Sequence, residues 1–288
     1  MAVSVRDRVF TGALRLSGAA ASTIVLLVVL YLCLGAIPAL SELGVGRFFT
    51  DTGWFPSAGA RDGSFNLTAM LAGSLATTIG AVALTAPLGV LSAIFSRFYA
   101  PEPLRRPYQR IVELLAGIPS VVYGFWGLVC LVPLIRELAP PGPSLLAGVL
   151  ILTIMILPTV ALLADAALEA IPLSQLEGAA ALGLSRLTTL RDVVFPAARA
   201  GLGIAVVLGT MRAIGETMAV LMVCGNVVQV PDSAFAPVRT LTANIALELG
   251  YATAEHRSVL FVSGVMLMLI VLALVAVQER LRRRAALA

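Results

Sequence analysis

Six long apolar runs, separated by segments that hold most of the charged residues, dominate the pattern of the chain. Each run is long enough to cross the hydrocarbon core of a bilayer, which takes about 20 apolar residues in a helix. The fold class is therefore an all-α membrane protein, and the first run is too long for the apolar core of a signal peptide. We predict six transmembrane helices over residues 16–40, 67–95, 111–135, 144–164, 200–225 and 258–277.

The arginines between the runs predict how the helices are oriented, because cytoplasmic loops of membrane proteins are enriched in basic residues. With a cytoplasmic N-terminus, most arginines fall on the cytoplasmic side, few fall outside, and Arg212 lies inside a run. We therefore expect both termini in the cytoplasm. The cytoplasmic set is Arg6, Arg8, Arg15, Arg97, Arg105, Arg106, Arg110, Arg186, Arg191, Arg199, Arg280, Arg282, Arg283 and Arg284, and the outer set is Arg47, Arg61, Arg136, Arg239 and Arg257.

The composition agrees with a membrane protein, since 59% of the residues are hydrophobic and only 12% are charged. The sequence has no phosphate-binding P-loop, and no cluster of histidine, cysteine and carboxylate residues with the spacing of a metal site. It also lacks an acid–base constellation typical of a catalytic site. We expect one transmembrane domain over residues 1–288 that is not an enzyme and has neither a metal site nor a nucleic-acid partner.

Two ionisable residues lie near the centre of the fifth run. Arg212 and Glu216 are the only charged residues between 201 and 230, and each costs about 2.5–3.5 kcal/mol at the centre of a membrane helix. They are four residues apart, so we expect them to share one helix face and to reach each other. One interpretation is a structural ion pair. The other is an oxyanion pathway lined by Arg212, whose planar guanidinium binds oxyanions through paired hydrogen bonds.

Gly117 and Pro119 are predicted to interrupt the third run. Proline removes a helical hydrogen bond, and the nearby hydroxyls of Ser120 and Tyr123 could satisfy the carbonyl that is freed. The interruption is compatible with a kinked packing helix or with a flexible element of a translocation path.

The segment 170–196 predicts a short helix that ends at a glycine. Ser174 stands three residues before Glu177, which is the spacing of a capping box. Gly183 can end the helix in the left-handed conformation. Small residues on this helix would let another protein approach its backbone, although an ordinary connector has the same local signals. These residues are Gly178, Ala179, Ala180 and Ala181.

A second short helix is expected after the glycine. Ser185 can cap its N-terminus, and we expect it to run to Val194. Pro196 can then occupy the first turn of the next membrane helix. Both short helices would lie across the cytoplasmic face.

The same segment resembles the EAA loop of ABC-transporter permeases. Glu177 begins the motif, Gly183 follows six residues later, and Pro196 closes it, while Gly178 and Phe195 are small departures from the usual residues. The resemblance implies that the segment forms coupling helices that dock on an ATPase subunit. The coupling residues that it implies are Glu177, Ala179, Ala180 and Gly183.

A further resemblance covers the chain from about Asn66 to Arg282. The stretches RAIGETMAV, which contains Arg212, and ELLAGIPSVVYG are similar to the permease subunits of bacterial phosphate-specific ABC transporters. The stretch TLTANIALELG looks more like the PstC type of subunit than the PstA type. The resemblance implies a type I ABC importer permease in the bacterial cell membrane, with a core over 67–282. The pathway residues that it implies are Arg212, Glu216, Thr217, Ser120 and Tyr123.

The partners also follow from this resemblance. They are a PstA-type permease, a dimer of ATPase subunits that holds ATP and Mg²⁺, and an extracytoplasmic phosphate-binding protein docked on the outer loops 41–66 and 226–257. No cofactor is expected in this chain, which would contact only phosphate and membrane lipid besides these proteins. The residues alone leave two alternatives: a permease for another oxyanion such as sulfate or molybdate, and a stand-alone secondary transporter.

Overall fold

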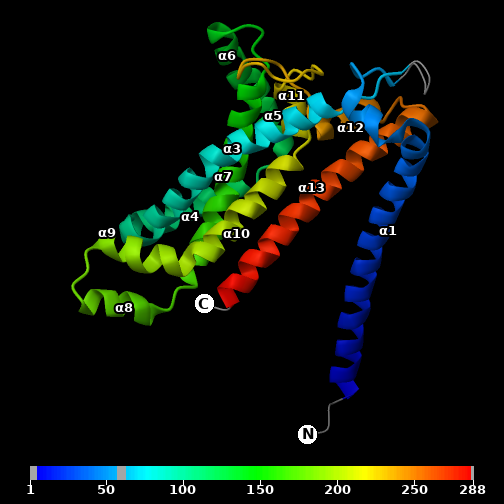
Figure 1. Cartoon of the computed structure of the whole chain (residues 1–288). Helices are drawn as coiled ribbons and strands as arrows, with labels where there is room; N and C mark the ends of the chain where they lie inside the picture. Colours follow the sequence, from blue (N-terminus) through cyan, green and yellow to red (C-terminus); the bar gives the residue numbers. More distant parts are fainter. Residues whose placement is uncertain (1–4, 57–62, 287–288) are drawn as a thin grey trace. The chain divides into compact units, whose positions relative to one another are not determined.

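A computed structural model of the chain describes residues 5–56 and 63–286 (Figure 1). The described residues form helices and two isolated β-bridges. Their contacts define two compact units, of which one comprises Met1–Asn66 and Leu249–Met266 and the other comprises Leu67–Glu248 and Leu267–Ala288. The last helix, α13 (Ala254–Ala286), therefore contributes its first part to one unit and its second part to the other.

The first unit is built on α1 (Val5–Thr50) and the beginning of α13. Hydrogen bonds join the two helices, because Ser258 Oγ accepts from the Ala39 amide at 3.0 Å and donates to the Gly35 carbonyl at 2.8 Å. Within α1, Gly44 has a φ of 70° and interrupts the helical backbone, which is a conformation that glycine adopts without strain.

The second unit is a helical bundle around α7, about half of whose residues are buried. Its elements are α3 (Thr68–Ile94), η2 (Phe95–Tyr99), α4 (Glu102–Ala116), α5 (Ser120–Trp126), η3 (Gly127–Leu131), α6 (Val132–Leu138), α7 (Leu145–Glu169), α8 (Leu173–Ala181), α9 (Arg186–Thr189), η4 (Leu190–Val194), α10 (Phe195–Ile214), α11 (Met218–Val223) and α12 (Leu241–Glu248).

Glycines let α3 and α10 approach α7 closely. A Cβ added at Gly89 of α3 or at Gly209 of α10 would lie 2.8 Å or 2.5 Å from a methyl group of Val160 on α7. Contacts this short are not tolerated in a packed interior. The three helices therefore meet at Val160, where the backbones are held at a fixed separation (Figure 1).

Six helices of the described chain are long and apolar enough to cross a membrane, which confirms the predicted all-α, six-helix class. They are Phe10–Thr50, Thr68–Tyr99, Ser120–Leu138, Leu145–Glu169, Arg186–Ile214 and Ala254–Arg283.

The boundaries of two predicted helices are wrong. The run 111–135 is divided, because the backbone is not helical at Pro119, and α4 is a separate amphipathic helix that begins at Glu102. The run 200–225 ends early, at Ile214, and begins early, because α9 and η4 continue into α10 without a turn. The second short helix expected in 170–196 is therefore the start of a membrane-crossing helix rather than a separate surface helix.

Candidate functional site

Arg212 and Glu216 do not lie on one continuous helix, because α10 ends between them at Ile214. Glu216 instead belongs to the start of α11, where its carboxylate Oε1 accepts the Ala219 amide at 3.1 Å. A carboxylate at this position satisfies one of the free amides at a helix start. The prediction that the two charges share one helix face is therefore wrong.

Arg212 is bound by a residue that the sequence analysis missed. Its Nη1 donates to Thr159 Oγ1 at 2.9 Å, across the contact between α10 and α7. Both side chains are half-buried. Among the described residues, no carboxylate forms an ion pair with Arg212. The guanidinium thus keeps its full charge and several of its donors for a further partner.

The interruption predicted in the third run is confirmed. Helix α4 ends at Ala116, and α5 begins at Ser120 after Pro119. Tyr123 fills the expected role, since its hydroxyl donates to the Leu115 carbonyl at 2.8 Å. Tyr123 of α5 and Ala213, the residue after Arg212, belong to the same buried hydrophobic cluster, so this break and the one at the end of α10 border the same core.

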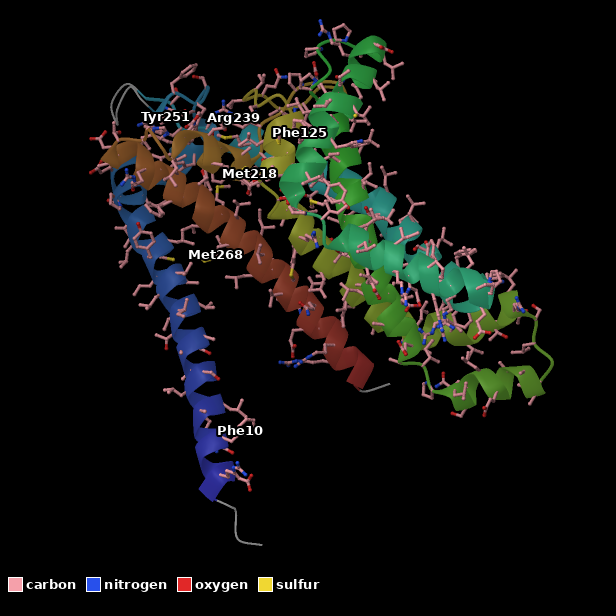
Figure 2. The ribbon with its side chains drawn as sticks, turned by 180° about the vertical axis from the view of Figure 1, so that it is seen from behind. Phe10, Phe125, Met218, Arg239, Tyr251 and Met268 are labelled. Carbon is pink, nitrogen blue, oxygen red and sulfur yellow. The ribbon has the colours of Figure 1, made fainter. Side chains whose placement is uncertain are left out.

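Close packing brings together the helices that follow the two breaks. A Cβ added at Gly124 of α5 would lie 2.8 Å from the Ala219 Cα of α11. Phe125 and Met218 mark these neighbouring helices in Figure 2. Ser120 and Thr217 are half-buried where α5 and α11 begin, and the Thr217 hydroxyl donates to the Gly215 carbonyl at 3.4 Å. The predicted pathway residues are therefore gathered around the two breaks, although the Glu216 carboxylate binds the Ala219 amide rather than Arg212.

The segment after α7 agrees in part with its prediction. Gly183 has a φ of 68°, and it ends α8 with two characteristic bonds: the Gly183 amide donates to the Ala180 carbonyl at 2.9 Å, and the Leu184 amide donates to the Ala179 carbonyl at 3.1 Å. Ser185 Oγ caps α9 by accepting the Thr188 amide at 3.2 Å, as predicted.

The capping box expected at Ser174 and Glu177 does not form, because α8 begins one residue before Ser174 and has Pro172 in the cap position. The coupling residues also differ in exposure. Ala179 is buried, while Glu177, Ala180 and Gly183 are exposed. Three large apolar side chains of the segment are exposed as well: Leu173, Leu182 and Leu187.

A second arginine of the bundle, Arg239, lies in a polar network that the sequence analysis did not foresee. It donates to Glu248 Oε1 at 2.7 Å, to Asn244 Oδ1 at 3.1 Å and to the Asn226 carbonyl at 2.9 Å. Glu248 is buried, at the end of α12. The network thus fixes α12 to the loop that carries Arg239.

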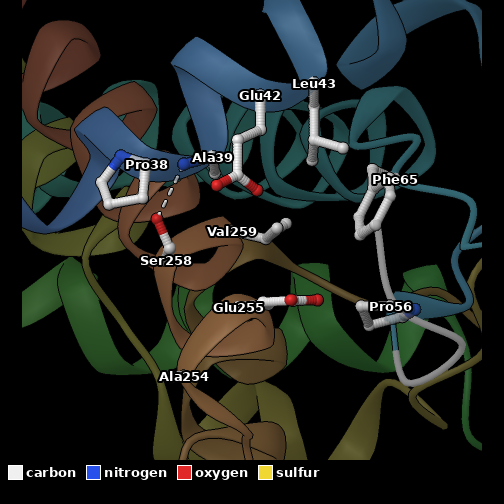
Figure 3. Close-up of a pocket in the computed structure, with 10 residues that line it drawn as sticks. All are labelled: Pro38, Ala39, Glu42, Leu43, Pro56, Phe65, Ala254, Glu255, Ser258 and Val259. Atoms are coloured by element: carbon white, nitrogen blue, oxygen red, sulfur yellow. Dashed lines mark hydrogen bonds between the residues drawn. The ribbon is translucent and has the colours of Figure 1, made fainter. Parts of the chain in front are cut away.

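The first unit contains a cavity of about 200 Å³ between α1 and the start of α13 (Figure 3). Among the described residues that line it, Glu42 and Glu255 are the charged ones, and none is basic. Two carboxylates would repel an oxyanion. The breaks around Arg212 are therefore the better candidate for an anion site.

The sequence is similar to a family of transport proteins and to individual permeases. The family model described as binding-protein-dependent transport system inner membrane component matches residues 85–287. The probable ABC transporter permease protein YqgH of Bacillus subtilis is 44% identical, over 72% of this chain and 67% of that protein. The phosphate transport system permease protein PstC of Mesorhizobium japonicum is 34% identical, over 98% of this chain and 91% of its own length.

A solved structure has a similar fold over about three quarters of the chain. It is an inward-facing conformation of the MetNI methionine ABC transporter, with a TM-score of 0.57 and 22% identity. The match covers 76% of this chain and 94% of that chain.

Proposed function

The chain belongs to the family of inner membrane components of binding-protein-dependent transport systems, and from this premise we propose that it is a permease subunit of an ATP-driven importer of inorganic phosphate. The expected class is confirmed: it is a multi-pass permease with the fold of type I ABC importers. The similarity to a phosphate permease of the PstC type over nearly the whole chain supports phosphate as the cargo and PstC as the subunit type.

The environment of Arg212 supports anion transport most directly. Its guanidinium lies where two helices are interrupted, it is half-buried, and it is bound by a neutral hydroxyl at 2.9 Å. A charge inside a membrane protein normally has a counter-ion or faces water. A passing phosphate would supply the counter-ion, and the bond would be transient because the anion must leave on the other side.

The other residues around the breaks have supporting roles in this proposal. Ser120 and Thr217 offer hydroxyls at the starts of α5 and α11. Tyr123 stabilises the break in the third run, because its hydroxyl donates to the Leu115 carbonyl. Glu216 stabilises the start of α11 by accepting the Ala219 amide. Gly117 and Pro119 provide the break itself, so that backbone as well as side chains line the path.

A complete importer requires partners, which we propose from the family. A second permease of the PstA type would complete the pore, and a dimer of ATPase subunits would bind ATP and Mg²⁺ and perform the hydrolysis. A phosphate-binding protein would dock on the outer loops 41–66 and 226–257. This arrangement needs both termini in the cytoplasm of a bacterial cell and places α8 against the ATPase.

The exposed side of α8 suits such a contact. Leu173 at the start of α8 and Leu182 just after its end present apolar surface, as does Leu187 of α9. Glu177 has no ion-pair or hydrogen-bond partner among the described residues. Glu177→Lys should reduce ATPase recovery in affinity purification of the complex, or uncouple ATP hydrolysis from uptake. Normal recovery together with normal coupling would remove Glu177 from the contact. Ala179 supports α8 from inside and does not contribute to this surface.

The function is tested by phosphate uptake at low micromolar concentration in cells that lack only this gene, with and without the gene restored. We expect gene-dependent uptake that excess sulfate or molybdate does not reduce. Uptake of sulfate or molybdate in place of phosphate would contradict the cargo but keep the transporter class. Uptake without any ATPase partner would contradict the class and favour a secondary transporter.

A further inference from the structure

We propose that Thr159 is a second anion-binding residue of the pathway, which donates a hydrogen bond to the same tetrahedral oxyanion that Arg212 attracts. The inference rests on the proposed function and adds a residue to the same site. Thr159 is 53 residues from Arg212 in the sequence, and it becomes part of the site only through the packing of α7 on α10.

The packing of α7 on α10 fixes the side chains of Thr159 and Arg212 relative to each other. Val160, the residue after Thr159, is in contact with α10 at Gly209, where an added Cβ would lie 2.5 Å from a Val160 methyl group. Gly209 stands three residues before Arg212, which is close to one helical turn. The contact between the Arg212 guanidinium and the Thr159 hydroxyl is therefore constrained by close backbone packing on both helices.

The hydroxyl of Thr159 differs from those of other threonines on these helices. Thr153 on α7 donates to the Val149 carbonyl at 2.7 Å, and Thr210 on α10 donates to the Val206 carbonyl at 2.8 Å. Each of these hydroxyls is thus bound within its own helix. Thr159 Oγ1 accepts from Arg212, and no acceptor for its own proton lies among the described residues. That proton can be donated to a ligand.

The ligand class follows from the donors. Arg212 and Thr159 together present N–H and O–H groups side by side. Two adjacent donor groups fit an anion with several oxygens, so that one oxygen binds the guanidinium and another binds the hydroxyl. Two open contacts, rather than a closed cage, also allow the anion to leave.

The test is the maximal rate of phosphate uptake by the complete transporter carrying Thr159→Val, Thr159→Ser or the matched control Thr210→Val. Valine keeps the shape of threonine and loses the hydroxyl, whereas serine keeps the hydroxyl and loses the methyl group. We expect Thr159→Val to lower uptake at least tenfold in assembled complexes, Thr159→Ser to keep at least half of the rate, and Thr210→Val to transport like the unchanged protein.

Normal uptake by Thr159→Val would overturn the inference, and so would a serine variant as impaired as the valine variant, which would indicate a packing role for the methyl group. If Thr159→Val does not assemble, Thr159→Ala and Thr159→Ser are compared, and equal uptake by these two overturns it. A wild-type complex that imports no phosphate would overturn the proposed function itself. Phosphate uptake that is insensitive to Thr159→Val would leave that function intact.

Discussion

Arg212 and Arg239 are both held by hydrogen bonds within the second unit, but their partners are of opposite kinds. Arg239 is bound by the Glu248 carboxylate at 2.7 Å and by the Asn244 side chain at 3.1 Å. Arg212 is bound by the neutral hydroxyl of Thr159 at 2.9 Å. One arginine is therefore neutralised by its own chain, whereas the other is not neutralised by any described residue.

This difference indicates that Arg239 stabilises the fold. A charge removed from water is tolerated when it is paired and hydrogen-bonded, and Arg239 meets both conditions. Arg97 does so as well, with Asp165 at 3.4 Å and Glu169 at 3.6 Å. Arg212 departs from this rule at the place where two helices are interrupted, which is why we assign it to the pathway of an anion.

Exchanging the charges of Arg212 and Glu216 gives the largest expected effect. The double variant Arg212→Glu/Glu216→Arg would preserve transport if the two residues were an ion pair. Because Glu216 instead binds the Ala219 amide at 3.1 Å, we expect phosphate uptake to fall at least 100-fold. Uptake near the wild-type rate, in cells with equal amounts of the complex, would show that the two residues act as an ion pair. Arg212 would then be neutralised by its own chain, as Arg239 is.

Removing one charge of the Arg239–Glu248 pair should lower the stability of the complex rather than act on anion binding. Arg239→Gln removes the guanidinium that the buried Glu248 carboxylate binds at 2.7 Å, and breaking such a pair destabilises a protein by about 3–5 kcal/mol. We expect a lower melting temperature of the purified complex. The neutral double variant Arg239→Gln/Glu248→Gln should recover part of the loss. A double variant less stable than Arg239→Gln would contradict the view that the pair is mutually neutralising.

Tyr123→Phe should have a moderate effect. The hydroxyl donates to the Leu115 carbonyl at 2.8 Å, and one such bond is worth about 1 kcal/mol. We expect a small decrease in the melting temperature and an uptake rate reduced less than tenfold, since the hydroxyl is occupied by the backbone. A loss of uptake as large as that of an Arg212 variant would place Tyr123 in contact with the anion.

Glu216→Gln should have the smallest effect. The glutamine oxygen can still accept the Ala219 amide that the carboxylate now binds, so we expect uptake within about threefold of wild type. Glu216→Ala is the companion variant, because it removes the acceptor and should lower the stability of the complex by about 1 kcal/mol. If Glu216→Gln abolished uptake in a fully assembled complex, the negative charge itself would be required, and Arg212 would have a counter-ion after all.

Local signals in the sequence predicted the features that depend on neighbouring residues. Gly183 was expected to end a helix and does so with a φ of 68°. The break at Pro119 was expected, and Tyr123 satisfies a carbonyl freed there. Helix caps and breaks of this kind depend on residues within one or two turns, which a single sequence displays.

Features that depend on packing between distant segments could not be predicted in this way. Thr159 meets Arg212 only because α7 lies against α10. Leu176 of α8 packs against the core of the bundle, and Ala179 is buried although its sequence neighbours are exposed. The Arg239 network likewise needs the position of α12. The charge pair Arg212 and Glu216 was misjudged because helical spacing applies only while the helix continues.

Phosphate uptake by two variants tests directly whether Arg212 binds the transported anion while Arg239 stabilises the fold. Arg212→Gln and the neutral double variant Arg239→Gln/Glu248→Gln are compared at matched amounts of assembled transporter. We expect Arg212→Gln to lose uptake at least 100-fold while the double variant retains most of it. Wild-type uptake by Arg212→Gln would show that Arg212 does not bind the anion.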